Sequence, residues 1–161
     1  MRVLLVRHAE AVDMRSAPSD HDRWLTEDGR QTATSVGRTL TMLDLDYARM
    51  YTSPLVRAVQ TAEILAATHP GFDGPLEVHR ALSVDEGTTA QAVAPLQDAE
   101  DDSLIVMVGH MPKVGAMAGF LGQLSSPPSF QTGAACLIHV EGRDGRLEWM
   151  LDPYTLERRA R

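Results

Sequence analysis

The stretch that most constrains the fold of this chain is Val3-Leu4-Leu5-Val6-Arg7-His8-Ala9-Glu10. Four consecutive apolar residues with no polar alternation predict a short strand buried on both faces, as in a parallel sheet covered by helices. The strand ends directly at an arginine and a histidine. Because open α/β sheets bind ligands beyond the carboxyl ends of their strands, Arg7 and His8 are candidate site residues.

A second apolar run repeats this arrangement. Residues 104–108 predict another doubly buried strand, and Gly109 and His110 follow at its end. If the two strands are neighbours in a parallel sheet, His8 and His110 face the same crevice.

Helical patterns lie between the predicted strands. Apolar residues recur at helical spacing over residues 27–43, with Thr26 as a plausible N-cap. Ser53 and Pro54 predict an N-cap followed by proline in the first turn of a second helix, and Pro112 predicts the start of a later one. The other predicted elements are a strand at 48–52, a weaker strand at 76–79 and a helix at 88–96.

The end of the chain predicts a β-hairpin. Two alternating segments, 135–140 and 146–151, flank the turn Gly142-Arg143-Asp144-Gly145. Residues 157–161 are polar and are expected to fray. We therefore expect a single α/β domain over residues 1–161, a three-layer sandwich whose mostly parallel sheet has helices on both faces and one antiparallel edge strand.

Composition narrows the classes of partner. The formal net charge is −7 and no basic stripe is present, so a nucleic-acid partner is not expected. No apolar run approaches the roughly 20 residues of a membrane span, and no signal peptide is recognisable, so we expect no membrane association. The one cysteine, Cys136, rules out a disulfide framework and fits a cytoplasmic protein. No histidine pair has metal-ligand spacing, so no metal is expected.

Four side chains are predicted to share one site. Arg7, His8 and His110 follow strands, and Arg57 lies near the start of the helix after Ser53-Pro54. Two guanidinium groups, two imidazoles and the free N–H groups of a helix start suit a tetrahedral dianion. A neutral imidazole in such a cage can attack phosphorus. Each residue alone has an ordinary structural explanation, so the prediction depends on their convergence.

Several blocks, in the family's order, resemble the histidine phosphatase superfamily, which has the phosphoglycerate-mutase-like fold. These blocks are Arg7-His8, Leu25-Thr26-x-x-Gly29, Ser53-Pro54-x-x-Arg57-Ala58-x-Gln60-Thr61 and Gly109-His110. Within the superfamily, the chain is most similar to the short bacterial SixA-type protein-phosphohistidine phosphatases. The features shared with that group are Arg7-His8-Ala9-Glu10, Asp20-x-x-Arg23-x-Leu25-Thr26, His110-Met111-Pro112 and the Trp149…Asp152-Pro153 ending.

The resemblance implies roles for these residues. His8 would be phosphorylated during turnover, and Arg7, Arg57 and His110 would form the phosphate pocket. Arg23 is either a contact at the rim of the substrate site or a structural ion-pair partner of an aspartate. No cofactor is implied, because phosphoryl transfer through a histidine in an arginine cage needs no divalent ion.

Two features depart from the family's pattern. Ala9 stands where the superfamily usually has glycine. Many members carry a glutamate after the third strand as general acid, and the corresponding stretch here offers Asp85 or Glu86. Either carboxylate would serve as the acid or would be a solvated loop residue.

The leading prediction is a phosphohistidine phosphatase acting on a protein substrate. Relatives that handle small phosphates commonly carry insertions over the site, whereas only about two dozen residues separate the third and fourth predicted strands here. The alternatives are a small-molecule phosphate monoesterase and a weakly catalytic phospho-ligand binding module. A phosphomutase is less favoured, because it must shield its phosphoenzyme from water. The oligomeric state is left open.

Overall fold

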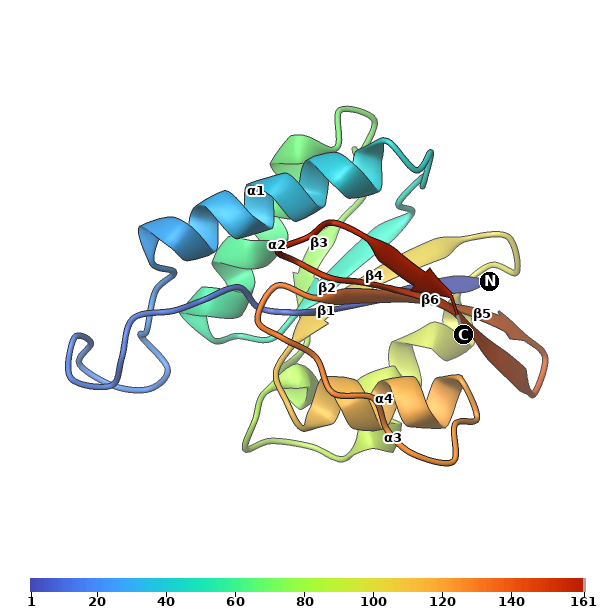
Figure 1. Cartoon of the computed structure of the whole chain (residues 1–161). Helices are drawn as coiled ribbons and strands as arrows, with labels where there is room; N and C mark the ends of the chain where they lie inside the picture. Colours follow the sequence, from blue (N-terminus) through green and yellow to red (C-terminus); the bar gives the residue numbers. More distant parts are fainter. Residues whose placement is uncertain (161) are drawn as a thin grey trace.

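The computed structural model describes residues 1–160, which form one seven-stranded sheet with helices packed against both of its faces (Figure 1). The strands are β1 (Arg2–Arg7), β2 (Arg49–Thr52), β3 (Leu76–Val78), β4 (Leu104–Gly109), β5 (Ala135–Glu141), β6 (Asp144–Leu151) and β7 (Arg158–Ala160). The α-helices are α1 (Glu27–Thr41), α2 (Val56–Thr68), α3 (Thr89–Val93) and α4 (Lys113–Leu121). Two short 3₁₀ turns, Arg80–Leu82 and Ala94–Asp98, flank α3.

The strand order is β3-β2-β4-β1-β5-β6-β7. The pairs β3–β2, β2–β4 and β4–β1 are parallel, whereas β1–β5, β5–β6 and β6–β7 are antiparallel. The predicted α/β class with helices on both faces is confirmed. The antiparallel part is larger than the single edge strand expected, because β5 pairs directly with β1. Residues 158–160, which were expected to fray, form β7 against β6.

The adjacent parallel strands β1 and β4 bring together the two histidines that were predicted to follow strand ends. Arg7 is the register partner of Gly109, so His8 and His110 both follow the last paired position. The amide of His8 donates to the carbonyl of Gly109 at 3.0 Å. The sequence condition for a shared crevice, that these two strands are neighbours, is therefore met.

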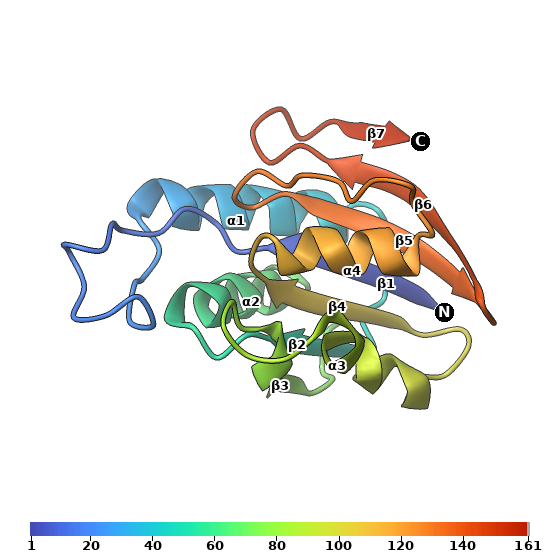
Figure 2. The same ribbon diagram turned by 90° about the horizontal axis from the view of Figure 1, so that it is seen from below.

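Alternate side chains of the buried strands fill two separate layers of the core. Leu4 and Val6 pack toward α1 and α2, whereas Val3 and Leu5 pack toward α3 and α4. Figure 2 shows the helices on the two sides of the sheet. All four strand residues are at most 1% exposed, as expected for a strand without polar alternation. None of the helices in residues 1–160 is long and apolar enough to cross a membrane.

The start of α1 is held against the chain that leaves β1. Thr26 is the N-cap, as predicted, and its Oγ1 accepts the amide of Gly29 at 2.9 Å. A Cβ at position 29 would lie 2.1 Å from the carbonyl oxygen of Glu10, so only glycine permits this close approach. The Leu25-Thr26-x-x-Gly29 block thus fixes the helix beside the segment that carries His8.

The start of α2 differs from the prediction. Its N-cap is Leu55 and the helix begins at Val56, so Ser53 is not the N-cap. The hydroxyl of Ser53 instead accepts the amide of Leu55 at 3.3 Å and contacts His110. Local sequence favours serine at a cap, but here the tertiary partner takes the side chain out of the capping geometry.

Candidate active site

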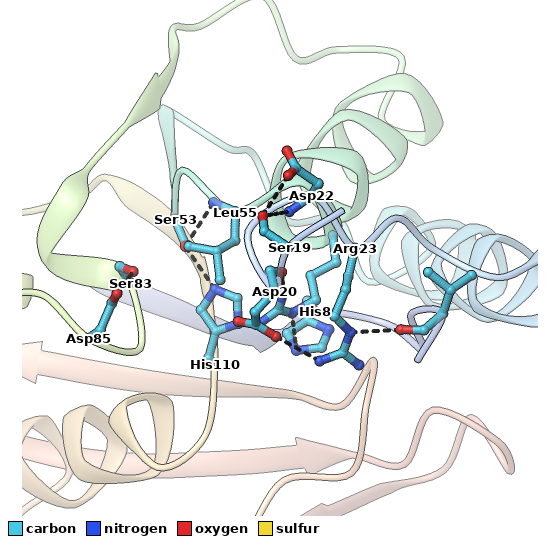
Figure 3. A network of polar contacts seen from close by, with 12 residues as sticks. His8, Ser19, Asp20, Asp22, Arg23, Ser53, Leu55, Ser83, Asp85 and His110 are labelled. Atoms are coloured by element: carbon cyan, nitrogen blue, oxygen red, sulfur yellow. Dashed lines mark hydrogen bonds and ion pairs between the residues drawn. The ribbon is translucent and has the colours of Figure 1, made fainter. Parts of the chain in front are cut away.

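The carboxyl ends of β1 and β4 and the first turn of α2 bring His8, Arg57 and His110 into contact. The two imidazole rings have centroids 4.9 Å apart and are tilted by 53°. Arg57 is the second residue of α2, and its Nε donates to Nε2 of His8 at 3.3 Å. All three residues are buried, with exposed fractions, counted over the whole residue, of 8% for His8, 3% for Arg57 and 1% for His110. Figure 3 shows both histidines facing one another.

The backbone of residue 9 determines which nitrogen of His8 is free. Nδ1 lies 2.7 Å from the carbonyl oxygen of Ala9. A carbonyl only accepts, so Nδ1 carries the ring proton, and the neutral ring keeps its lone pair on Nε2. This lone pair points toward the guanidinium of Arg57, where a phosphoryl group would be bound.

The surroundings keep His8 neutral. Burial lowers the pKa of His8, and the charges of Arg57, Arg7 and Arg23 lower it further against the opposing hydrogen bond to Ala9, to about 4. The imidazole is thus unprotonated at neutral pH, as a nucleophile requires.

His110 has one nitrogen engaged and one available. Its Nε2 lies 2.7 Å from the hydroxyl of Ser53, which already accepts the amide of Leu55. The hydroxyl proton is therefore free to donate to Nε2, which places the ring proton of neutral His110 on Nδ1. Within residues 1–160, Nδ1 is buried and has no hydrogen-bond partner. Burial, with the nearby His8 and Arg57, lowers the pKa of His110 to about 3.

Arg7 reaches the same region from the last position of β1. Its Nη1 donates to the carbonyl of Phe130 at 2.6 Å, and its Nε is buried without a partner in the described chain. The guanidinium is therefore anchored at one end and retains unused donors. A bound oxyanion would satisfy them.

Asp20 joins the site, although the sequence did not predict it as a site residue. Its Oδ2 is 3.1 Å from Nη2 of Arg57, and its carbonyl accepts from Nη1 at 2.6 Å. Its Oδ1 is 2.9 Å from Nη1 of Arg23. Arg23 therefore makes the ion pair with an aspartate that the sequence left open. The spacing Asp20-x-x-Arg23 was the available signal, but the approach to Arg57 is a tertiary contact.

The rest of the Arg57 motif anchors the two chain segments beside it. One turn along α2, Thr61 Oγ1 accepts the amide of Ala9 at 3.1 Å and donates to the carbonyl of Arg57 at 2.7 Å. Gln60 Oε1 accepts the amide of Leu25 at 2.8 Å. These bonds hold the residue after His8 and the start of α1 against the helix that carries Arg57.

The two candidate acids lie on the segment between β3 and α3. Ser83 Oγ donates to Oδ1 of Asp85 at 2.6 Å, and this bond is the main reason why the pKa of Asp85 is lowered. Glu86 instead pairs with Arg80, whose Nε is 3.2 Å from Oε2. In Figure 3 Asp85 is bonded to Ser83 and lies apart from His8 and His110. Geometry thus separates two carboxylates that the sequence left equivalent.

The segment that carries Asp85 is fastened to α4. Lys113 Nζ donates to the carbonyls of Ala81 at 2.9 Å and Ser83 at 2.5 Å, and also to the carbonyl of Glu86. One ammonium therefore holds both ends of the short turn around Asp85. Lys113 follows His110 by three residues, so the same connection positions both.

The site combines a buried, neutral histidine with arginines at the strand ends of an α/β sheet. This combination is typical of proteins that bind and transfer phosphoryl groups. Residues 3–83 match the histidine phosphatase superfamily (branch 1), and the chain belongs to that superfamily. The resemblance seen in the sequence is thereby confirmed.

Two relatives extend the comparison. An uncharacterized protein of Picosynechococcus sp. is 38% identical over 120 residues, covering 73% of this chain and 71% of the relative. The phosphohistidine phosphatase SixA of Escherichia coli is 27% identical over 160 residues, covering 98% and 97%. A solved structure of the protein histidine phosphatase SixA with tungstate superposes with a TM-score of 0.88 at 27% identity, covering 98% of this chain and 100% of that one. Membership and these matches together support a phosphatase.

Proposed function

We propose that this protein is a phosphohistidine phosphatase that hydrolyses a phosphorylated protein through a phospho-His8 intermediate. The observation that carries the proposal is the lone pair of His8 Nε2, which lies on a neutral ring and faces the guanidinium of Arg57, with Nε of Arg57 at 3.3 Å. The likeness to SixA over nearly the whole of both chains supports phosphohistidine as the substrate class.

In the first step, Nε2 of His8 attacks phosphorus in line with the leaving group. The new Nε2–P bond forms as the bond from phosphorus to the substrate nitrogen breaks. The substrate ring, protonated on its other nitrogen, keeps that electron pair and leaves as neutral imidazole. Charge on the three equatorial oxygens would be stabilised by Arg7, Arg57 and the Nδ1 proton of His110. These are the groups whose donors remain unused or face His8.

In the second step, water attacks the phosphorus of phospho-His8. The Nε2–P bond breaks, its electron pair returns to Nε2, and the proton lost by the water passes to solvent or to a nearby carboxylate. Inorganic phosphate then leaves the cage. The hydrogen bond from Nδ1 to the carbonyl of Ala9 keeps the ring in one orientation through both steps.

The state of the candidate acids supports this substrate. Hydrolysis of an alkyl phosphate requires protonation of a strongly basic alkoxide. A phosphohistidine protonated on its other ring nitrogen instead releases neutral imidazole, whose reference pKa is near 6.5, and this group leaves readily. Asp85 accepts a hydrogen bond and has a lowered pKa, and Glu86 is paired with Arg80. The lowered pKa of Asp85 favours its charged form over proton donation, which suits phosphohistidine.

The test compares a phosphohistidine-bearing protein with an alkyl phosphate as substrates. We expect a higher kcat/KM on phosphohistidine, and an acid-labile phosphoryl label trapped on the wild-type protein by alkaline quench. His8→Ala should abolish the activity and the label. His139→Ala should retain the activity and the label, because His139 lies on β5 opposite Arg2, at the end of β1 away from the site. Higher kcat/KM on the alkyl ester would identify a small-molecule monoesterase. Binding of phospho-ligands without turnover would identify a binding module.

A further inference from the structure

The guanidinium of Arg57 is already engaged by an anion of the chain itself. Nη2 pairs with the carboxylate of Asp20 at 3.1 Å, and Nη1 donates to the carbonyl of the same residue at 2.6 Å. The remaining nitrogen, Nε, donates to His8. Carboxylates and phosphates bind the planar arginine fork in the same way, through parallel N–H bonds.

From this overlap we propose that the Asp20 carboxylate is an internal competitor for the phosphoryl group at Arg57, and that it sets how weakly the site holds phosphate. The inference rests on the proposed function, because it takes Arg57 as a phosphate ligand. A phosphoryl dianion on the same fork would meet a like charge at contact distance, so the carboxylate must withdraw from Nη2 as the phosphoryl group enters.

Arg23 provides the place to which the carboxylate withdraws. Its Nη1 pairs with the other oxygen, Oδ1, at 2.9 Å, and its Nε is fixed by the carbonyl of Val12 at 2.7 Å. Asp20 can thus leave Arg57 and remain paired with a cation. Its side chain is 38% exposed, which leaves room for this movement, whereas Arg57 is 4% exposed and stays in place.

Asp20 competes as an anion at neutral pH. Burial alone would raise the pKa of its carboxyl group, but the hydrogen bonds and charges of Arg23 and Arg57 lower it below the ordinary value. The competitor is therefore ionised at neutral pH. Its effect falls on every ligand that presents a phosphoryl group, and above all on the product, inorganic phosphate, which has no contacts outside the phosphate pocket to offset it.

The experiment measures the Kd of inorganic phosphate by calorimetry for the wild type, Asp20→Asn and Asp22→Asn. Asp22 is the matched control, because it lies two residues away in the same loop and carries the same charge, and within residues 1–160 its side chain bonds only to Ser19. We expect Asp20→Asn to bind phosphate about tenfold more tightly, a gain of about 1.4 kcal/mol. Asp22→Asn should stay within about twofold of the wild type. Asp20→Glu, which retains the charge, should not bind more tightly.

Unchanged or weaker phosphate binding in Asp20→Asn, with an unaltered thermal unfolding midpoint, would overturn the inference and make Asp20 a residue that positions Arg57. Equal tightening in Asp22→Asn would also overturn it, because net charge would then explain the gain. These results leave the proposed function intact, since they concern the strength of phosphate binding. Absence of phosphate binding in all the variants and the wild type would instead overturn the proposed function with it.

Discussion

At the scale of single residues, the chemistry of the site depends on where two ring protons lie. The carbonyl of Ala9 holds the proton of His8 on Nδ1, and the hydroxyl of Ser53 engages Nε2 of His110. In each ring, the nitrogen that is not engaged by this partner remains available to the site. His8 thereby offers a lone pair and His110 offers an N–H, which are complementary needs of phosphoryl transfer.

Arg57→Lys is expected to lower kcat/KM strongly. Lysine has no planar fork, so it cannot donate to His8 and to a phosphoryl group from fixed positions, and we expect a loss of about 2–4 kcal/mol in transition-state stabilisation. The measurement is kcat/KM on phosphohistidine, with Arg49→Lys as control, because Arg49 is an exposed arginine of β2 paired with Glu77. Kinetics near the wild type would show that Arg57 is peripheral to the chemistry.

Ser53→Ala is expected to lower kcat more than it changes KM for the substrate. The substitution removes the hydrogen-bond partner of His110 Nε2, so the ring proton is no longer directed to Nδ1. A loss of about tenfold is reasonable for a hydrogen bond of about 1–3 kcal/mol that is left unsatisfied. Ser103→Ala, at the other end of β4, is the control. If Ser53→Ala retained full kcat, the orientation of His110 would not depend on this serine.

At the scale of elements, the segment between β3 and α3 is the part of the site with the least defined chemistry. Three hydrogen bonds from Lys113 fasten it to the start of α4, so its geometry depends on α4 rather than on its own sequence. The segment presents Asp85 with Ser83 and turns Glu86 toward Arg80.

The two acids should therefore behave differently when they are neutralised one at a time. Asp85→Asn is expected to cost much less on phosphohistidine than on an alkyl phosphate, because only the alkoxide needs a proton as it leaves. Glu86→Gln should have little effect on either substrate, since its partner is Arg80. The measurement is kcat/KM for both substrates in both variants. Equal large losses on both substrates for Asp85→Asn would identify a full general acid and remove this reason for preferring phosphohistidine.

At the scale of the whole molecule, the site makes folding sensitive to acid. His8 and His110 have pKa values of about 4 and about 3 in the folded protein, against 6.5 as ordinary values. Between these limits the unfolded chain binds protons that the folded chain does not, so the free energy of unfolding falls as the pH falls from about 6.5 toward 3. Above about pH 6.5 both histidines are neutral in the folded and the unfolded chain, so this loss in the free energy of unfolding disappears.

Urea unfolding at pH 7.5 and pH 5 should show this loss, and His8→Gln should reduce it. Each buried histidine contributes on the order of 2 kcal/mol across this interval, by linkage between the folded and unfolded pKa values. His139→Gln is the control, because His139 is partly exposed and lies opposite Arg2, at the end of β1 away from the site. A pH dependence that is the same in His8→Gln and the wild type would contradict the assignment of a buried neutral His8.

Much of the architecture was predictable from local patterns. Residues 3–6 and 104–108 are apolar at every position, and a strand with this pattern is stable only when it is covered on both faces. Thr26 at the N-cap of α1 was likewise readable, because capping depends on neighbours within one turn. The four predicted site residues were found by their blocks, and their catalytic roles remain predictions.

By itself, the sequence determined which segments are buried strands and which are amphipathic helices, and which motif residues follow the strands. It could do so because burial pattern and capping depend on a few neighbouring positions. Only the tertiary structure decided that β5 pairs with β1, that Ser53 serves His110 rather than α2, and that Asp20 shares the fork of Arg57. Each of these contacts joins residues at least 37 positions apart, and Asp20 and Arg57 are separated by that number. Such contacts depend on how the whole sheet and its connections pack, and no local propensity specifies them.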